Sequence, residues 1–414
     1  EEARGALMSK IIKLQYDMVQ KEHPDAPCCT NLYGETMELY NEGYLNIPDN
    51  VIKIWADNGY GKMVTRRQDN HNPRVNSLPR KEDSGSNGIY YHVSFYDLQA
   101  ANHITMLPNS PGFIGNELEE VINHRGNDFW LINCSNVKPH VYFLDLVATL
   151  WKEGTIDCNK HRMEYVRTYY GEEGAEQIAK CFEEYPDYAV AYGPNQDDHA
   201  GEQFTNHVAR ILVSQYMREK TRPAEELKWA TDALALHDQI HWYQALCKKG
   251  KNGYKEYRKQ CEATALSLPE AAETLFRDSL LLQVQIHEQC YLGAYHMCES
   301  LLFAEQGQYE QAFYQAGKAR KAYIEGNVAM RQREHGKWSG FYKNECLTDV
   351  KQTAWVLEGL MSYLRNLGDG PHFYKWQREF LYPEEDRKIM LLLNYENHLT
   401  DQELFQLMEQ KLGK

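Results

Sequence analysis

The sequence lacks the features of membrane-spanning and nucleic-acid-binding proteins. No apolar run has the length that a membrane-spanning helix needs. The 414 residues carry a formal net charge of −14, and no basic cluster stands out that would neutralise a phosphate backbone. We therefore expect a protein that neither crosses a membrane nor binds nucleic acid.

Several catalytic motifs are also absent. The sequence has no phosphate-binding P-loop, no Gly-x-Gly-x-x-Gly after a strand, no Gly-x-Ser-x-Gly turn and no His-Glu-x-x-His helix. Nucleotide-binding, dinucleotide-binding and serine-hydrolase functions therefore lose support. The 16 histidines are scattered rather than spaced as metal ligands, so we expect no metal site and no organic cofactor.

The cysteines give a first indication of the compartment. The chain has ten of them, without paired Cys-x-x-Cys motifs and without the density of a small disulfide scaffold. Reduced cysteines favour the cytoplasm, which is the expected localisation. The chain begins at Glu1 with no signal-peptide pattern after it, and a signal peptide lost upstream would place the protein in the periplasm or outside the cell.

The pattern of apolar residues divides the chain into three predicted segments. Residues 1–157 alternate short apolar runs with amphipathic stretches, which is typical of βα units around a parallel sheet. Residues 158–366 are helical throughout and predict an antiparallel helical bundle. Residues 367–414 form a C-terminal extension. The strands expected in the first segment are residues 28–33, 51–56, 89–95 and 129–132, with helices at 3–21, 36–45, 118–123 and 141–151.

Three further elements are predicted beyond the first segment. Residues 279–305 have the length and apolar content of a buried bundle helix. Residues 390–393 are apolar enough for a short strand. Thr400 and Glu403 have the spacing of a capping box, which predicts that the last helix begins there.

Polar side chains follow each of the four predicted strands. In a parallel barrel the chemistry collects at the carboxyl ends of the strands, where the βα loops converge. A single Asp or Asn at such a place is often only a turn residue, but four successive strand ends with polar groups predict a site. The candidate residues are Glu35 after the first strand, Asp57 and Asn58 after the second, His92 and Tyr96 at the third, and Asn133 at the fourth.

Glu35 is the most informative of these residues. A carboxylic acid among tyrosines and apolar strand residues is desolvated, which raises its pKa and suits a general acid near neutral pH. The alternative is that Glu35 lies in the first turn of the following helix and interacts with the helix dipole.

These residues occur in motifs that resemble glycoside hydrolase family 115, the xylan α-glucuronidases. The similarity covers about residues 10–170 and continues more loosely into the helical segment, where Lys337-Trp338 resembles a Lys-Trp element of the family. The motifs are Ile54-Trp55-Ala56-Asp57-Asn58-Gly59-Tyr60-Gly61, then Arg66-Arg67, then Gly88-Ile89-Tyr90-Tyr91-His92, then Trp130-Leu131-Ile132-Asn133 with Lys138-Pro139.

The resemblance implies a fold and a reaction. The fold class is α/β plus all-α: residues 1–157 are the second half of a (β/α)8 TIM-type barrel, and a helical bundle follows. The reaction removes (4-O-methyl)glucuronic acid, α-1,2-linked to xylose in glucuronoxylan, with inversion. By position Glu35 matches the catalytic acid, Asn58 and Asn133 match residues of the uronic-acid pocket, and Tyr96 matches a pocket tyrosine if one residue is inserted before it.

The sequence also departs from the family pattern. The stretch 68–87 is longer than usual, and Asp57-Asn58-Gly59-Tyr60 replaces an Asp-Asn-Trp-Gly pattern. The family barrel begins well before this chain does, and an inverting enzyme needs a base about 6.5–9.5 Å from its acid. We therefore expect the base and the missing barrel half to lie upstream or in a partner chain, and a homodimer of half barrels is the other way to close the sheet.

The substrate is expected to be an acidic oligo- or polysaccharide. The candidates for binding its carboxylate are Arg66, Arg67, Arg80 and Lys138. Two other functions stay open at this point. One is a noncatalytic glycan-binding protein without a base, and the other is a hydrolase or lyase for another acidic glycan.

Overall fold

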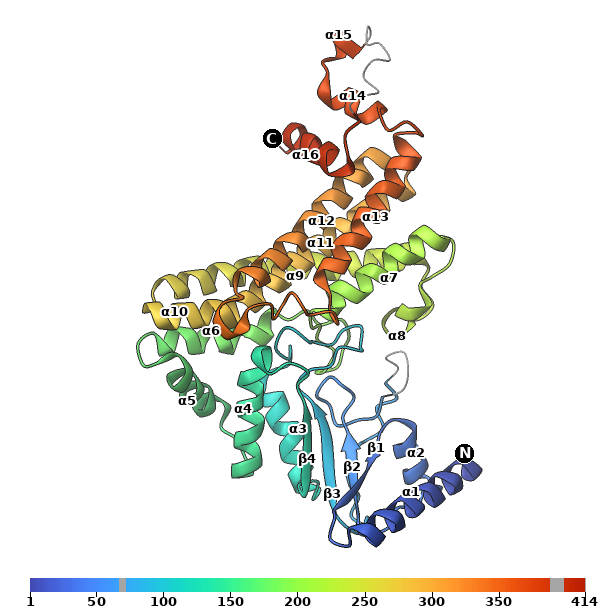
Figure 1. Ribbon diagram of the computed structural model, residues 1–414, viewed down its shortest axis with the longest axis vertical. Helices are drawn as coiled ribbons and strands as arrows, with labels where there is room; N and C mark the ends of the chain where they lie inside the picture. Colours follow the sequence, from blue (N-terminus) through green and yellow to red (C-terminus); the bar gives the residue numbers. More distant parts are fainter. Residues whose placement is uncertain (67–71, 388–397, 414) are drawn as a thin grey trace. The chain divides into compact units, whose positions relative to one another are not determined.

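The computed structural model describes residues 1–66, 72–387 and 398–413 (Figure 1). Contacts between residues divide the chain into two compact units: Glu1–Gly201 with Ser267–Leu275, and Glu202–Leu266 with Phe276–Lys414. This division differs from the three expected segments, whose boundaries stay a prediction. In the described part, no helix is both long and apolar enough to cross a lipid bilayer.

The first unit contains a parallel sheet of four strands in the order β1-β2-β3-β4. Sequential order with parallel pairing needs a crossover after each strand, as the alternating sequence pattern predicts. The parallel sheet is thus confirmed, with helices after β1, β3 and β4 and, among the described residues, a loop without a helix between β2 and β3. Closure into a barrel is not tested by it. The strands are β1 (Cys28–Leu32), β2 (Val51–Ala56), β3 (Asn87–His92) and β4 (Phe129–Asn133).

Helices precede, connect and follow these strands. Helix α3 begins where Ser110 accepts a hydrogen bond from the Phe113 backbone N–H at 3.1 Å, with Pro111 in the first turn, seven residues before the predicted start. The helices of this unit are α1 (Glu2–Glu22), α2 (Glu35–Asn41), α3 (Pro111–Asn123), α4 (Val137–Glu153), α5 (Cys158–Tyr170) and α6 (Ala175–Tyr188).

Apolar side chains remain exposed at both ends of the sheet. Among the described residues, β1 and β4 each pair with one neighbouring strand only. Phe129 and Leu131 on β4 are exposed, and so are Leu7 and Leu14 of the apolar stripe that predicted α1. Apolar side chains on β4 and α1 are thus exposed to solvent in the described structure.

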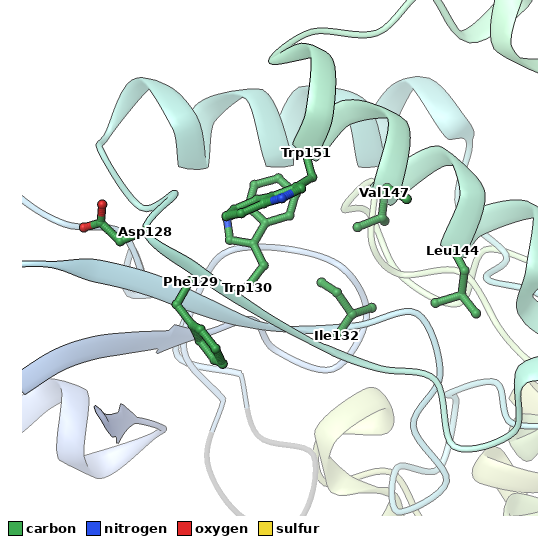
Figure 2. A pocket seen from close by; sticks show the side chains of 8 residues that line it. Asp128, Phe129, Trp130, Ile132, Leu144, Val147 and Trp151 are labelled. Atoms are coloured by element: carbon green, nitrogen blue, oxygen red, sulfur yellow. The ribbon is translucent and has the colours of Figure 1, made fainter. Parts of the chain in front are cut away.

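A cleft lies between β4 and α4 (Figure 2). The indole of Trp151 on α4 lies against that of Trp130 on β4, with ring centroids 4.8 Å apart. Trp130 Nε1 donates a hydrogen bond to the Gly126 carbonyl at 3.0 Å, so the polar atom of its indole is satisfied. The cleft is lined by Asp128, Phe129, Trp130, Ile132, Leu144, Val147, Ala148 and Trp151.

The second unit is helical in its described residues. Helix α11 is buried on all sides between its neighbours; it packs against α9 and α12, and α12 packs against α13. The elements of this unit are α7 (Gln203–Glu219), η1 (Glu225–Leu227), α8 (Lys228–Thr231), α9 (Leu236–Leu266), η2 (Arg277–Leu281), α11 (Leu282–Glu305), α12 (Tyr309–Gln332), η3 (Gly336–Trp338), α13 (Val350–Gly368), α14 (Lys375–Leu381), α15 (Glu384–Arg387) and α16 (Asp401–Leu412), while α10 (Glu270–Phe276) belongs to the first unit up to Leu275.

Two of the three predicted elements beyond the sheet can be compared with the structure. The helix expected at 279–305 is confirmed over Leu282–Glu305, preceded by a π-helical turn at Arg277–Leu281. The capping box of Thr400 and Glu403 is confirmed, with both of its hydrogen bonds present. The strand expected at 390–393 lies outside the described residues.

Candidate functional site

Side chains from all four strands meet at the carboxyl edge of the sheet. Tyr90 and His92 lie two residues apart on β3 and therefore point to the same face of the sheet, with ring centroids 4.4 Å apart. Tyr33 lies on one side of this pair, and Asn133 donates a hydrogen bond to the Tyr90 hydroxyl at 2.9 Å on the other. We name this group the strand-end cluster; its members are Tyr33, Arg66, Tyr90, His92, Phe95 and Asn133.

Arg66 brings a positive charge into this aromatic group. Its guanidinium lies over the rings of Tyr33 and Phe95, 5.6 and 5.4 Å from their centroids, and donates a hydrogen bond to the Tyr33 hydroxyl. Gly34 makes this approach possible, because a Cβ there would lie 2.8 Å from the Arg66 carbonyl oxygen and its φ is +54°. Burial raises the pKa of Tyr33 although Arg66 opposes the shift, so the hydroxyl stays protonated at neutral pH.

His92 is held by a carboxylate. Both His92 and Asp57 are buried, and the Nδ1 atom of His92 contacts Oδ1 of Asp57. A carboxylate only accepts hydrogen bonds, so Nδ1 carries a proton and the ring orientation is set by Asp57. Among the described residues, the other nitrogen, Nε2, has no hydrogen-bond partner. His92 therefore has one ring nitrogen bonded to Asp57 and one without a hydrogen-bond partner among the described residues.

The loop after β2 is built by two adjacent side chains, Asp57 and Asn58. The second oxygen of Asp57, Oδ2, accepts a hydrogen bond from the Gly61 N–H at 3.0 Å. Asn58 Oδ1 accepts from the N–H groups of Tyr60 and Lys62 at 3.0 and 3.2 Å. We refer to residues 57–62 as the Asp57–Lys62 loop; its shape depends on these side-chain to backbone bonds.

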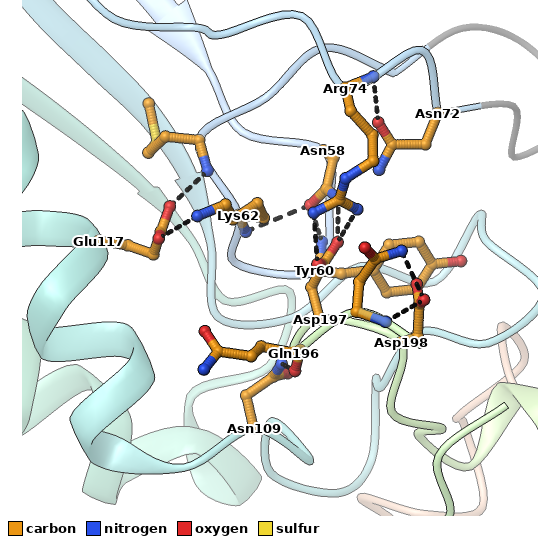
Figure 3. Close-up of polar contacts among 12 residues, drawn as sticks. Asn58, Tyr60, Lys62, Asn72, Arg74, Asn109, Glu117, Gln196, Asp197 and Asp198 are labelled. Carbon is orange, nitrogen blue, oxygen red and sulfur yellow. Dashed lines mark hydrogen bonds and ion pairs between the residues drawn. The ribbon is translucent and has the colours of Figure 1, made fainter. Parts of the chain in front are cut away.

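A second polar network surrounds this loop (Figure 3). The amide of Asn58 donates to Asp197 at 2.8 Å, and the guanidinium of Arg74 binds both oxygens of Asp197 at 3.1 and 2.9 Å. Lys62 forms an ion pair of 2.5 Å with Glu117 on α3. The loop is thus tied to two other segments of the same unit.

Comparison with known proteins identifies this part of the chain. Residues 1–195 match the model of glycosyl hydrolase family 115. This segment is therefore similar to family 115. The resemblance seen in the sequence motifs is confirmed.

A solved structure has a similar fold. It is described as a family GH115 4-O-methyl-α-glucuronidase, BtGH115A, with specificity for decorated arabinogalactans. The TM-score is 0.57 at 17% sequence identity, and the match covers 86% of this chain and 42% of the other. The chain therefore spans less than half the length of that family 115 protein. No curated protein matches this chain.

The structure changes the expected environment of Glu35. Helix α2 begins at Glu35, so the side chain lies in the first helical turn, where its Oε2 accepts an ion-paired hydrogen bond of 2.5 Å from Arg4 on α1. The side chain is 50% exposed. The expectation that tyrosines and apolar residues desolvate it is wrong for this structure, and the first-turn alternative describes its position. Its role as the family 115 acid stays a prediction.

The other predicted residues divide into two groups. Asp57, Asn58 and His92 are buried and bonded within the loop and the cluster, and Asn133 bonds to Tyr90 and accepts the Ser135 N–H at 3.1 Å. Their contact with a sugar stays a prediction.

Tyr96, the remaining predicted residue, lies at the margin of the cluster, with its ring centroid 6.2 Å from that of Phe95. It is 41% exposed, and its ring faces His103 at 6.0 Å. Phe95 lies beside His92, with ring centroids 4.5 Å apart, and the match of Tyr96 to a pocket tyrosine stays a prediction.

The candidate carboxylate-binding cations are also separated by the structure. Arg66 lies in the strand-end cluster. Arg80 forms an ion pair of 3.1 Å with Asp83, and Lys138 lies in the first turn of α4. Arg67 lies outside the described residues. Of the three that the structure describes, Arg66 lies in the strand-end cluster, and Arg80 lies over the ring of Tyr40, 5.7 Å from its centroid.

Sequence reasoning missed Tyr90, Phe95 and Asp197. Tyr90 had a signal, because it lies two residues before His92 and thus on the same face of the strand. Tyr91, the next residue of the same motif, faces the other side, where its hydroxyl donates to the Gly61 carbonyl at 2.8 Å. Asp197 had no local signal, since 139 residues separate it from Asn58.

Proposed function

We propose that this protein is a glycoside hydrolase that removes α-1,2-linked (4-O-methyl)glucuronic acid from glucuronoxylan, with inversion at the anomeric carbon. The observation that carries the proposal is that the family 115 match, residues 1–195, contains the whole strand-end cluster. The cluster offers what an acidic sugar needs: aromatic faces, hydroxyl and amide groups, and a cation.

Each part of the cluster has a proposed role. The rings of Tyr33, Tyr90 and Phe95 present flat apolar surface to the face of a sugar ring. Arg66 supplies the charge for the uronate carboxylate, a contact worth about 1.5–3 kcal/mol when charge-assisted. His92 Nε2 and the Asn133 amide are proposed to bind the sugar hydroxyls.

Glu35 is the proposed general acid. To protonate the leaving oxygen its carboxyl group must release Arg4 and be covered by the substrate, because the side chain is half exposed without one. Covering the carboxyl with the substrate desolvates its charged form, which favours the protonated state that an acid needs.

The catalytic base is proposed to come from outside this chain. An inverting hydrolase needs a second carboxylate about 6.5–9.5 Å from the acid. The chain spans 42% of the solved family 115 structure, and both edge strands of its described sheet have an unpaired side. We propose that further strands, from an upstream segment or a partner chain, close the sheet and bring the base.

The cleft of Figure 2 and the apolar stripe of α1 are the surfaces such a segment would cover. Pairing of two copies, with β4 of one beside β1 of the other, is the alternative. Light-scattering mass measurement in solution separates the two, because a monomer of the full-length protein excludes closure by a second copy.

Release of free (4-O-methyl)glucuronic acid tests the function. The substrates are glucuronoxylan fragments and, in parallel, decorated arabinogalactan; the variants are Glu35→Gln and, as a matched control, Glu42→Gln at the exposed end of the same helix. We expect release from glucuronoxylan by the wild type and Glu42→Gln, and a loss of at least about 100-fold in Glu35→Gln.

Each other outcome contradicts part of the proposal. Equal release by wild type and Glu35→Gln would reject Glu35 as the acid. Release from arabinogalactan alone would change the substrate. An unsaturated uronate as product would indicate a lyase, and binding without release would indicate a glycan-binding protein.

A further inference from the structure

The residue Asp197 lies just beyond the part of the chain that matches family 115, which ends at residue 195. It follows helix α6 and belongs to the same unit as the sheet. Its side chain is only 2% exposed, yet it carries an acidic group. A buried carboxylate destabilises the folded state unless it is fully paired, so the hydrogen bonds of Asp197 indicate its structural role.

Both carboxylate oxygens of Asp197 are used. Arg74 binds them in a two-point contact, Nη1 to Oδ2 at 3.1 Å and Nη2 to Oδ1 at 2.9 Å. Oδ2 also accepts the amide of Asn58 at 2.8 Å. Figure 3 shows Arg74 and Asn58 pointing at the same carboxylate. The negative charge is therefore neutralised and simultaneously holds the Asn58 side chain in one orientation.

The oriented side chain of Asn58 in turn holds backbone N–H groups of the Asp57–Lys62 loop. With its amide nitrogen on Asp197, its oxygen Oδ1 faces the N–H groups of Tyr60 and Lys62. Gly59 and Gly61 in the same loop have φ of +85° and +80°, so the loop needs such bonds to keep its turn.

Asp57 connects the loop to the cluster. One of its oxygens holds the Gly61 N–H, and the other holds Nδ1 of His92. A shift of the loop therefore moves the carboxylate that orients the His92 ring.

The segment that presents Asp197 is itself well fixed. Ala191 and His199 form an antiparallel bridge, and the Asp198 carboxylate closes the turn between them by accepting the Asn195 N–H at 2.8 Å. The Gln196 carbonyl accepts a hydrogen bond from the Asn109 amide at 3.1 Å. Because this segment is fixed, the position of Asp197 is fixed where it bonds to the Asp57–Lys62 loop.

We infer that Asp197 is a positioning residue for the strand-end cluster: through Asn58 it locks the Asp57–Lys62 loop, and through Asp57 the loop fixes the tautomer and orientation of His92. The functional unit of this protein then extends at least to Asp198, beyond the matched family segment. The structural part of the inference stands without the proposed function; only its effect on sugar release rests on it.

Hydrogen exchange of the full-length protein tests the lock. In Asp197→Asn, the amides of Tyr60, Gly61 and Lys62 are expected to exchange at least about tenfold faster than in the wild type, because a charge-assisted contact is lost. The matched control is Asp187→Asn, which removes an exposed carboxylate on α6, in the same unit. It is expected to leave these amides unchanged.

The imidazole ¹⁵N signals of His92 test the second step. The wild type and Asp187→Asn are expected to show the tautomer protonated at Nδ1, whereas Asp197→Asn is expected to show a mixture. A general loss of stability does not produce this signature in the folded protein. If Asp197→Asn does not fold, Arg74→Lys takes its place, since it keeps the charge and loses the two-point contact.

The outcomes separate this inference from the proposed function. Unchanged exchange and an unchanged His92 signal in Asp197→Asn, or in Arg74→Lys in its place, overturn the inference whether or not the wild type releases a uronic acid. Faster exchange with a mixed tautomer supports it. If the wild type then releases no uronic acid, the function fails while the positioning role of Asp197 stands.

Discussion

His287 should make the helical unit sensitive to acid. It lies fully buried on α11, with its ring stacked on Tyr254 of α9 at a centroid distance of 4.6 Å and an angle of 13°. Burial lowers the pKa of His287 from 6.5 to about 3, because the charged ring is poorly solvated there. The folded protein therefore keeps this ring neutral over a range of pH in which the unfolded chain protonates it.

The sign and size of the effect follow from the two pKa values. Below pH 6.5 the unfolded state binds more protons than the folded state, so the free energy of unfolding falls as the pH falls toward 3. The loss is about 1.4 kcal/mol per pH unit, which amounts to about 2 kcal/mol between pH 8 and pH 5. This is a large share of the stability of an ordinary domain.

The substitution His287→Phe removes the titration and keeps an aromatic ring in the stack. Urea unfolding of the helical unit, followed by circular dichroism at pH 8 and pH 5, measures the difference. We expect the wild type to lose about 2 kcal/mol more than His287→Phe between these two pH values. The control His241→Phe replaces an exposed histidine and should behave as the wild type. Equal pH dependence of wild type and His287→Phe would refute the reasoning.

Two further predictions concern packing and helix capping. Gly317→Ala places a Cβ against the ring of Phe405 and should lower the free energy of unfolding by about 1–3 kcal/mol. Gly359 is exposed on helix α13 and a Cβ there would meet no described atom within 4 Å outside the backbone of its own helix, so Gly359→Ala should raise the free energy of unfolding by up to about 1 kcal/mol. The midpoints of urea unfolding measure both effects. Ser110→Ala removes the cap of α3 and should cost about 1 kcal/mol, while Ser110→Thr retains most of it; equal midpoints for the two would contradict the capping role.

The sheet shows which strand boundaries can be predicted from the local sequence pattern. The β-branched run Val51–Ala56 is a strand over the predicted residues. The third strand was predicted to reach Phe95 but ends at His92, because the N–H groups of Val93 and Ser94 both turn to the same carbonyl, that of Asn133. Apolar character continues past His92 in the sequence, so only the pairing with β4 reveals the end.

Glu35 shows where the pattern is insufficient. The sequence places a carboxylate directly after a strand, which holds true. Whether it points into the cluster or into the first helical turn depends on where α2 begins, and the presence of Arg4 on α1 depends on how a distant helix packs.

The sequence by itself determined the alternation of strands and helices, the capping box of the last helix and the family motifs around Asp57 and His92, because these depend on neighbours within a few residues. Only the tertiary structure decided that Asn58 is held by Asp197 and that Arg74 joins them, across separations of 139 and 123 residues. Such contacts depend on the path of the whole chain, and no local spacing encodes them.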